Sequence, residues 1–243
     1  MLPTKTLAPF DTSCSGKILW PMAPDESSMG NVIGYFAQTY PDPKCFLDYT
    51  TPYTLLVAVV LSAQATDRSV NLLMPILIDR ADSPEKMLAL GVDGLRAVIA
   101  SIGLHRRKSE YILALSEKLI TDHFGQVPHT LESLVALPGV GRKTANVVLN
   151  VIFGQPTIPV DTHVERVSKR LGWVGDNLAN PLRVEEILNQ MIPLPWKHHI
   201  HAWLIAHGRR FCKARSPLCV TCPVQSHCTF FRNKAPQGST SQT

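Results

Sequence analysis

The chain has 243 residues, of which 45% are hydrophobic and 18% are charged. This length and composition are typical of a globular protein with one large hydrophobic core or two small ones. The longest apolar run, 55–61, is far shorter than the roughly 20 residues that cross a bilayer, so we expect no membrane span. Residues 1–25 lack the pattern of a secretory signal or a transit peptide, which predicts a cytoplasmic protein. The net charge of +5 is compatible with a polyanionic partner and does not establish one.

Helical periodicity predominates along the chain, and strand-like alternation is nowhere sustained. We therefore predict an all-α protein with a mobile tail over residues 1–25 and a disordered tail over 231–243. A further helix is expected to begin at Ser83 and Pro84, which are typical N-cap and first-turn residues. The other expected helices cover 28–40, 51–63, 108–124, 130–137, 142–153, 162–171, 181–191 and 198–207.

A glycine-rich turn separates two of these helices, in the segment Leu-Pro-Gly-Val-Gly-Arg-Lys over 137–143. Pro138 ends one helix, Gly139 and Gly141 permit a tight turn with positive φ, and Lys143 lies in the first turn of the next helix. Such a hairpin directs backbone N–H groups outward and is suited to binding a phosphate. The adjacent Arg142 and the helix dipole are both expected to lower the pKa of Lys143 and so make it a better nucleophile. A solvated lysine beside an ordinary turn is the alternative.

Asp161 follows the hairpin by 18 positions in the segment Val-Asp-Thr-His, after a proline-containing apolar connection. It precedes a predicted helix, so it can be an N-cap residue. A carboxylate there can equally be a buried acid beside a reaction centre. The two roles are compatible, and the sequence leaves both open.

Four of the six cysteines are concentrated near the C-terminus with six, two and five residues between them. In a cytoplasmic chain this spacing indicates metal-binding thiolates rather than disulfides. The spacing by itself is compatible with zinc or with an iron–sulfur cluster. The four residues are Cys212, Cys219, Cys222 and Cys228.

The hairpin, the Val-Asp-Thr-His segment and the cysteine array, in this order, closely resemble the endonuclease III family of helix-hairpin-helix DNA glycosylases. The resemblance runs from about residue 29 to 230 and includes the segments 61–67 and 102–104. It implies a nucleophile, Lys143, that attacks the sugar C1′, releases a damaged pyrimidine and forms a Schiff base before strand cleavage. It implies that Asp161 stabilises positive charge on the sugar and helps to move protons.

The resemblance also favours a structural [4Fe–4S] cluster over zinc on the four cysteines, and double-stranded DNA with damaged pyrimidines or abasic sites as the partner. Lys213 and Arg215, between the first two cysteines, could contact phosphates or be ordinary solvated charges. By resemblance, Gln64 and Leu104 fill the gap left by an extruded nucleotide, although a helix-capping amide and a core leucine are plausible alternatives. The basic run 105–108 is suited to the nearby DNA backbone, and a solvated charged face is the alternative. The predicted DNA-binding set comprises Gln64, Leu104, Gly139, Val140, Gly141, Arg142, Lys213 and Arg215.

The resemblance predicts a central helical domain over 45–155 and a cluster domain that joins 26–44 to 156–230, with the DNA cleft between them. Lys143 and Asp161 would then come from different domains. Nothing in the sequence requires an oligomer, so we expect a monomer.

The histidines near residue 200 are predicted to pack or face solvent rather than bind metal. Two rival functions are a mismatch adenine glycosylase, disfavoured by Lys143 and the short C-terminal segment, and a zinc-containing DNA-binding module without activity.

Overall fold

The computed structural model describes residues 28–41, 43 and 45–234, and every regular element within them is helical. The predicted tail over 1–25 and the predicted disorder over 235–243 lie outside the described residues. Within the described residues, no helix has the length and apolar character needed to cross a bilayer. In chain order the elements are α1 (Ser28–Thr39), α2 (Pro52–Ser62), α3 (Asp67–Arg80), α4 (Pro84–Ile99), α5 (His105–His123), α6 (Leu131–Val135), α7 (Arg142–Phe153), α8 (Thr162–Leu171), α9 (Pro181–Met191), α10 (Leu194–Arg210), the short 3-10 helices η1 (Cys219–Thr221) and η2 (Gln225–His227), and α11 (Thr229–Lys234).

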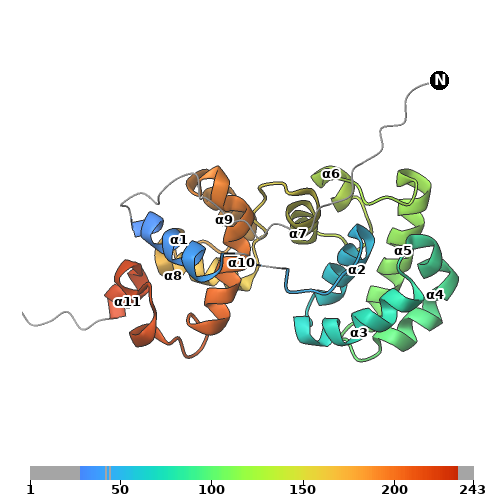
Figure 1. The fold of residues 1–243 in the computed structure, drawn as a ribbon, viewed down its shortest axis with the longest axis horizontal. Helices are drawn as coiled ribbons and strands as arrows, with labels where there is room; N and C mark the ends of the chain where they lie inside the picture. Colours follow the sequence, from blue (N-terminus) through green and yellow to red (C-terminus); the bar gives the residue numbers. More distant parts are fainter. Residues whose placement is uncertain (1–27, 42, 44, 235–243) are drawn as a thin grey trace, which may run out of the picture.

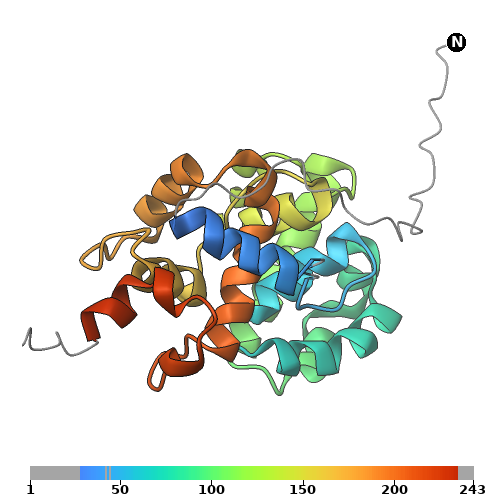
Figure 2. The same ribbon diagram turned by 60° about the vertical axis from the view of Figure 1, so that its left-hand side comes forward.

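Two separate hydrophobic cores organise these helices into the two lobes seen in Figure 1. The first core is built by α2 to α7, with the almost entirely buried α2 at its centre. The second is built by α1, α8, α9 and α10, and α1 crosses the front of α10 in Figure 2. There the Phe36 and Trp203 rings lie 6.3 Å apart, and the Trp203 indole donates to the Tyr40 carbonyl at 2.8 Å. We propose that the two cores define the two predicted domains, 45–155 and 26–44 with 156–230.

Several predicted helix boundaries need correction. Residues 231–234, predicted to be disordered, belong to α11. The helix α3 was not predicted, because Pro75 interrupts its pattern, yet Val70 and Met74 are fully buried at helical spacing. The helix α10 extends beyond the predicted 198–207 at both ends, and α5 begins at His105 rather than at residue 108.

Candidate active site

The hairpin between α6 and α7 has the predicted shape, but its two glycines have different roles. Gly139 has φ of +75°, and a Cβ there would lie only 2.7 Å from Cβ of Tyr111. Gly141 is the N-cap of α7 with φ of −88°, and a Cβ there would have no atom within 4 Å. Val140 is buried, and its N–H donates to the Leu137 carbonyl at 3.1 Å. Val140 therefore anchors the turn, whereas the first-turn N–H groups of α7 have no acceptor within their own helix.

Lys143 and Asp161 line the same pocket, which has a volume of about 420 Å³. Lys143 lies exposed in the first turn of α7, and Asp161 immediately precedes α8. The last residue of α2, the first residue of α3 and the side chain of Arg209 from α10 also line this pocket. The pocket thus draws residues from the helices of both hydrophobic cores, which places an ammonium and a carboxylate at a common opening between them.

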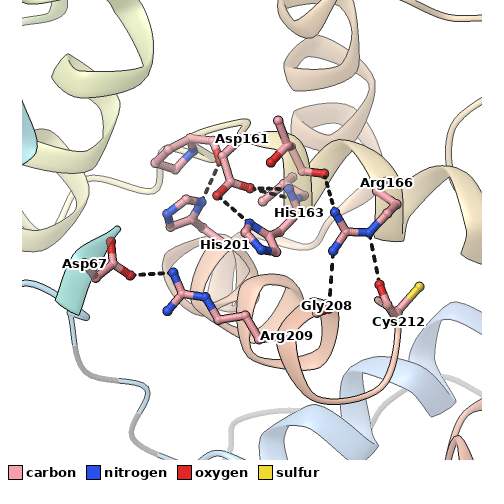
Figure 3. A network of polar contacts seen from close by, with 11 residues as sticks. Asp67, Asp161, His163, Arg166, His201, Gly208, Arg209 and Cys212 are labelled. Atoms are coloured by element: carbon pink, nitrogen blue, oxygen red, sulfur yellow. Dashed lines mark hydrogen bonds and ion pairs between the residues drawn. The ribbon is translucent and has the colours of Figure 1, made fainter. Parts of the chain in front are cut away.

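Asp161 combines the two roles that the sequence left open. One carboxylate oxygen accepts the backbone N–H groups of His163 and Val164, both at 2.8 Å, and so caps α8. The other lies 3.2 Å from Nδ1 of His163 (Figure 3). Burial would raise the pKa of Asp161, but the hydrogen bonds from His163 and Val164 and the nearby His201 and Lys143 outweigh it and lower the pKa. Asp161 is therefore an ionised carboxylate at neutral pH.

His201, on α10, faces Asp161 from the other side (Figure 3). Its Nδ1 lies 2.6 Å from the carbonyl oxygen of Pro159, and because a carbonyl only accepts, Nδ1 carries the proton. Burial lowers the pKa of His201 to about 4, so the ring is neutral at neutral pH. The sequence predicts only that this histidine packs or faces solvent, and no pattern in it indicates a position beside an acid 40 residues away along the chain.

Arg142 reaches from α7 to the second core, although its side chain remains 47% exposed. Its guanidinium forms a bidentate ion pair with Glu185 of α9, with the shortest N–O distance 2.8 Å. Glu185 is buried, and the ion pair raises the pKa of Arg142. No motif in the sequence indicated Glu185, because a single acid on an amphipathic helix carries no signal of a partner 43 residues away.

A second ion pair joins the cores at the pocket, between Asp67 at the start of α3 and Arg209 on α10 (Figure 3). The Arg209 guanidinium also lies over the Phe46 ring, 4.6 Å from its centroid. Both charged residues line the pocket with Lys143 and Asp161. Asp67 belongs to the segment 61–67 that the family resemblance includes, but no sequence pattern indicates a contact with Arg209.

The two predicted wedge residues, Gln64 and Leu104, are both exposed and both have left-handed backbone conformations, with φ of 54° and 61°. The core alternative does not hold for Leu104, which is 54% exposed. Gln64 directly follows Ala63, the C-cap of α2, where a left-handed residue is a common way to end a helix, so its position fits the helix-end alternative as well. Non-glycine residues are uncommon in this region of backbone space. In the basic run 105–108, however, Lys108 is buried, so its predicted role at the DNA backbone is wrong.

The four cysteines line one pocket, together with apolar side chains of α8 and α11 and with His207 of α10. The Cys228 thiol donates to the Arg170 carbonyl at 3.1 Å, and the Arg170 guanidinium donates to the Cys212 sulfur at 3.4 Å. Burial raises the pKa of Cys222 to about 11 and also raises the pKa of Cys228, so a nearby cationic group would favour ionisation of these two thiols. Four sulfurs around one buried pocket fit a metal–sulfur cluster.

The loop after Cys212 carries Lys213 and Arg215 on the surface, and α8 holds its backbone in place. Arg170 donates to the Lys213 carbonyl at 2.7 Å and to the Ala214 carbonyl at 2.9 Å. One turn earlier, Arg166 donates to the Cys212 carbonyl at 3.0 Å and to the Gly208 carbonyl at 3.2 Å (Figure 3). A single helix therefore begins at Asp161 and ends at the cysteine pocket.

Comparison with known proteins identifies the family. The family model for HhH-GPD superfamily base excision DNA repair proteins matches residues 57–194, and the model for the iron–sulfur binding domain of endonuclease III matches residues 212–228. The chain is 49% identical over 205 residues to endonuclease III of Rickettsia felis, covering 84% of this chain and 95% of that protein. The chain belongs to the endonuclease III family. Endonuclease III of Escherichia coli is 47% identical over 191 residues, covering 78% of this chain and 89% of that protein.

Solved structures of endonuclease III extend this result to the fold. A trapped covalent intermediate of endonuclease III with DNA matches with a TM-score of 0.81 and 42% identity, covering 86% of this chain and 97% of that one. A non-covalent endonuclease III–DNA complex matches with a TM-score of 0.80 over 84% of this chain and 95% of that one. The chain is accordingly a base excision repair DNA glycosylase and abasic-site lyase that binds DNA and a [4Fe–4S] cluster.

Proposed function

We propose that this endonuclease III family member removes oxidised pyrimidines from duplex DNA with Lys143 as the nucleophile and Asp161 as the stabilising acid. The observation that carries the proposal is the common pocket of these two residues, one from each side of the domain boundary. Asp161 is ionised and held rigidly by three hydrogen bonds, whereas Lys143 projects from the phosphate-binding end of α7. Its flexible side chain can then reach a sugar that enters the pocket.

The chemistry begins when the neutral amine of Lys143 attacks C1′ of the damaged nucleotide. The glycosidic bond breaks and the base leaves with its electron pair and takes up a proton. Opening of the sugar ring gives an imine between Lys143 and C1′, and loss of a C2′ proton then expels the 3′ phosphate by β-elimination. Hydrolysis of the imine returns the lysine and leaves a nicked strand.

Asp161 acts in this scheme mainly through its charge. A carboxylate with a lowered pKa is a weak base, so electrostatic stabilisation of the positive sugar is better supported than proton transfer. At neutral pH the His201 ring beside Asp161 is neutral, so it brings no positive charge that would compete with the sugar for the carboxylate. The carboxylate can therefore stabilise the positive charge that develops at C1′.

DNA contacts are proposed at three places around the pocket. The first-turn N–H groups of α7, with Gly139, Gly141 and Arg142, receive a phosphate, while Val140 anchors the turn. Lys213 and Arg215 meet the backbone beyond the pocket, on a loop whose shape is set by Arg170. Gln64 and Leu104 occupy the space of the extruded nucleotide.

The iron–sulfur cluster is proposed to be held by Cys212, Cys219, Cys222 and Cys228. This assignment is supported by their shared pocket and by the matched segment 212–228, which begins and ends at the outermost two. When bound, the cluster would cross-link this segment structurally.

We also propose that the protein acts as a monomer on the chromosome in the cytoplasm, since one chain supplies both catalytic groups.

Borohydride trapping tests the proposal, with purified protein and a duplex that contains one oxidised pyrimidine. We expect a covalent crosslink with the wild type and none with Lys143→Gln, because the amide fills a similar volume without being nucleophilic. DNA binding by the variant should be retained. Lys86→Gln, which removes an exposed lysine on α4, is the matched control and should crosslink normally.

Two other outcomes would contradict the assignment. Base release without a lysine-dependent crosslink would indicate a glycosylase that lacks the lyase step. DNA binding with neither base release nor a crosslink would favour the inactive binding module.

A further inference from the structure

Lys108 is a buried cation that the proposed chemistry does not use. It is only 4% exposed, and its ammonium donates to the Leu61 carbonyl at 2.9 Å. Burying an ammonium is costly, and an apolar residue of similar length would fill the same space at less cost to folding. A specific role therefore has to account for the positive charge at this position.

The acceptor of this hydrogen bond lies at the end of α2, directly before the loop that carries Gln64. Carbonyl groups in the last turn of a helix lack intrahelical partners, and a cation there also meets the negative end of the helix dipole. The Lys108 side chain thus fixes the last turn of α2. Three residues beyond Leu61, the backbone of Gln64 takes its left-handed conformation.

The backbone of Lys108 reaches the second wedge residue. Its N–H donates to the Leu104 carbonyl at 3.0 Å, in the first hydrogen bond of α5, and Leu104 is also left-handed. The two loops lie against each other, because a Cβ on Gly103 would be 3.8 Å from the Gln64 carbonyl oxygen. Lys108 is therefore bonded through its side chain to one loop and through its backbone to the other.

We propose that Lys108 is a positioning residue that holds Gln64 and Leu104 in register for entry into the duplex as the damaged nucleotide is extruded. This inference rests on the proposed function, in which these two residues occupy the vacated space. This positioning role explains why the contact between Lys108 and the Leu61 carbonyl is a polar, directional hydrogen bond. A hydrophobic contact would allow the end of α2 to slide against α5, whereas an ammonium–carbonyl hydrogen bond fixes one distance.

The test compares duplex with single-stranded substrates, because a single strand has no partner base and no gap to fill. Lys108→Met keeps the length of the side chain and removes the donor. We expect single-turnover base release from duplex DNA to slow by about tenfold or more, the size expected for loss of a charged hydrogen bond. Borohydride trapping on a single-stranded abasic oligonucleotide should be unchanged. Lys118→Met, an exposed lysine on the same helix, should match the wild type on both substrates.

A double-mutant cycle separates positioning from a general loss of stability. In a Gln64→Ala/Leu104→Ala background, Lys108→Met should have no further effect on duplex cleavage, since the residues that it positions are already gone. Thermal melting establishes that each variant is folded, and Lys108→Gln replaces Lys108→Met in the cycle if the methionine variant does not fold.

Equal slowing on both substrates, or additive effects in the cycle, would overturn the positioning role and leave Lys108 as a structural residue. Wild-type protein that traps neither substrate would instead overturn the proposed function itself. The two failures are therefore distinguishable.

Discussion

At the scale of single residues, Asp161 shows how one side chain can satisfy two demands. Its first oxygen accepts the N–H groups of His163 and Val164, and its second contacts the His163 ring. The same hydrogen bonds that begin α8 also lower the pKa of the acid. The structural role thus maintains the charge that the proposed chemistry requires, so the start of α8 and the proposed catalytic carboxylate are the same side chain.

The two roles of Asp161 can be separated by substitution. Asp161→Asn keeps an N-cap acceptor and removes the charge, so we expect a folded protein and base release slower by about 10²–10³-fold. Its melting temperature should fall somewhat, because the hydrogen bonds that lower the pKa of Asp161 favour the charged acid. Asp161→Ala should lose a similar activity and, in addition, about 1 kcal/mol of stability. Single-turnover kinetics and thermal melting check both effects. An unfolded Asp161→Asn protein would show that capping depends on the charge.

At the scale of elements, the hairpin before α7 depends on one glycine more than on the other. The sequence predicted positive φ at both, but only Gly139 has it, and only there does a neighbouring side chain leave no room for Cβ. Gly141 caps α7 in an extended conformation that any residue can adopt. The strain of the turn is therefore concentrated where the hairpin packs on Tyr111 of α5.

A matched pair of alanine variants tests this difference. Gly139→Ala should lower stability by about 1–2 kcal/mol for the left-handed backbone alone, with a further loss from the contact with Tyr111. Gly141→Ala should melt like the wild type, because the added methyl group meets nothing. Chemical denaturation measures both. Equal destabilisation by the two changes would contradict the geometry described for the turn.

At the scale of the whole molecule, two ion pairs connect the cores around the pocket. Arg142 joins α7 to Glu185 of α9, and Arg209 joins α10 to Asp67 of α3. Because Lys143 follows Arg142 directly and Asp161 belongs to the other core, we expect these contacts to influence the separation of the proposed catalytic pair. A loosened interface is expected to reduce activity before it reduces DNA binding.

Glu185→Gln tests this coupling, with Glu186→Gln as its control. Glu186 neighbours Glu185 and lies near Arg142, but its hydrogen-bonded partner is Arg183 on its own helix, so Glu186→Gln removes a nearby charge without removing the bidentate contact across the interface. We expect Glu185→Gln to slow base release by about tenfold through misplacement of Lys143, with little change in affinity for a damaged duplex. Matched kinetics and binding measurements decide the matter, and unchanged kinetics would show that the ion pair does not set the catalytic geometry.

Local sequence patterns were sufficient to predict the all-helical class and most helix positions, because periodic apolar residues, caps and prolines act on nearby backbone. The hairpin, the Val-Asp-Thr-His segment and the cysteine spacing also indicated the family. The contacts between charged groups became visible in the folded structure alone: Arg142 with Glu185, His201 beside Asp161, and Lys108 buried against Leu61. Such pairs join residues that are far apart along the chain, and their partners are chosen by the packing of helices, for which no local pattern exists.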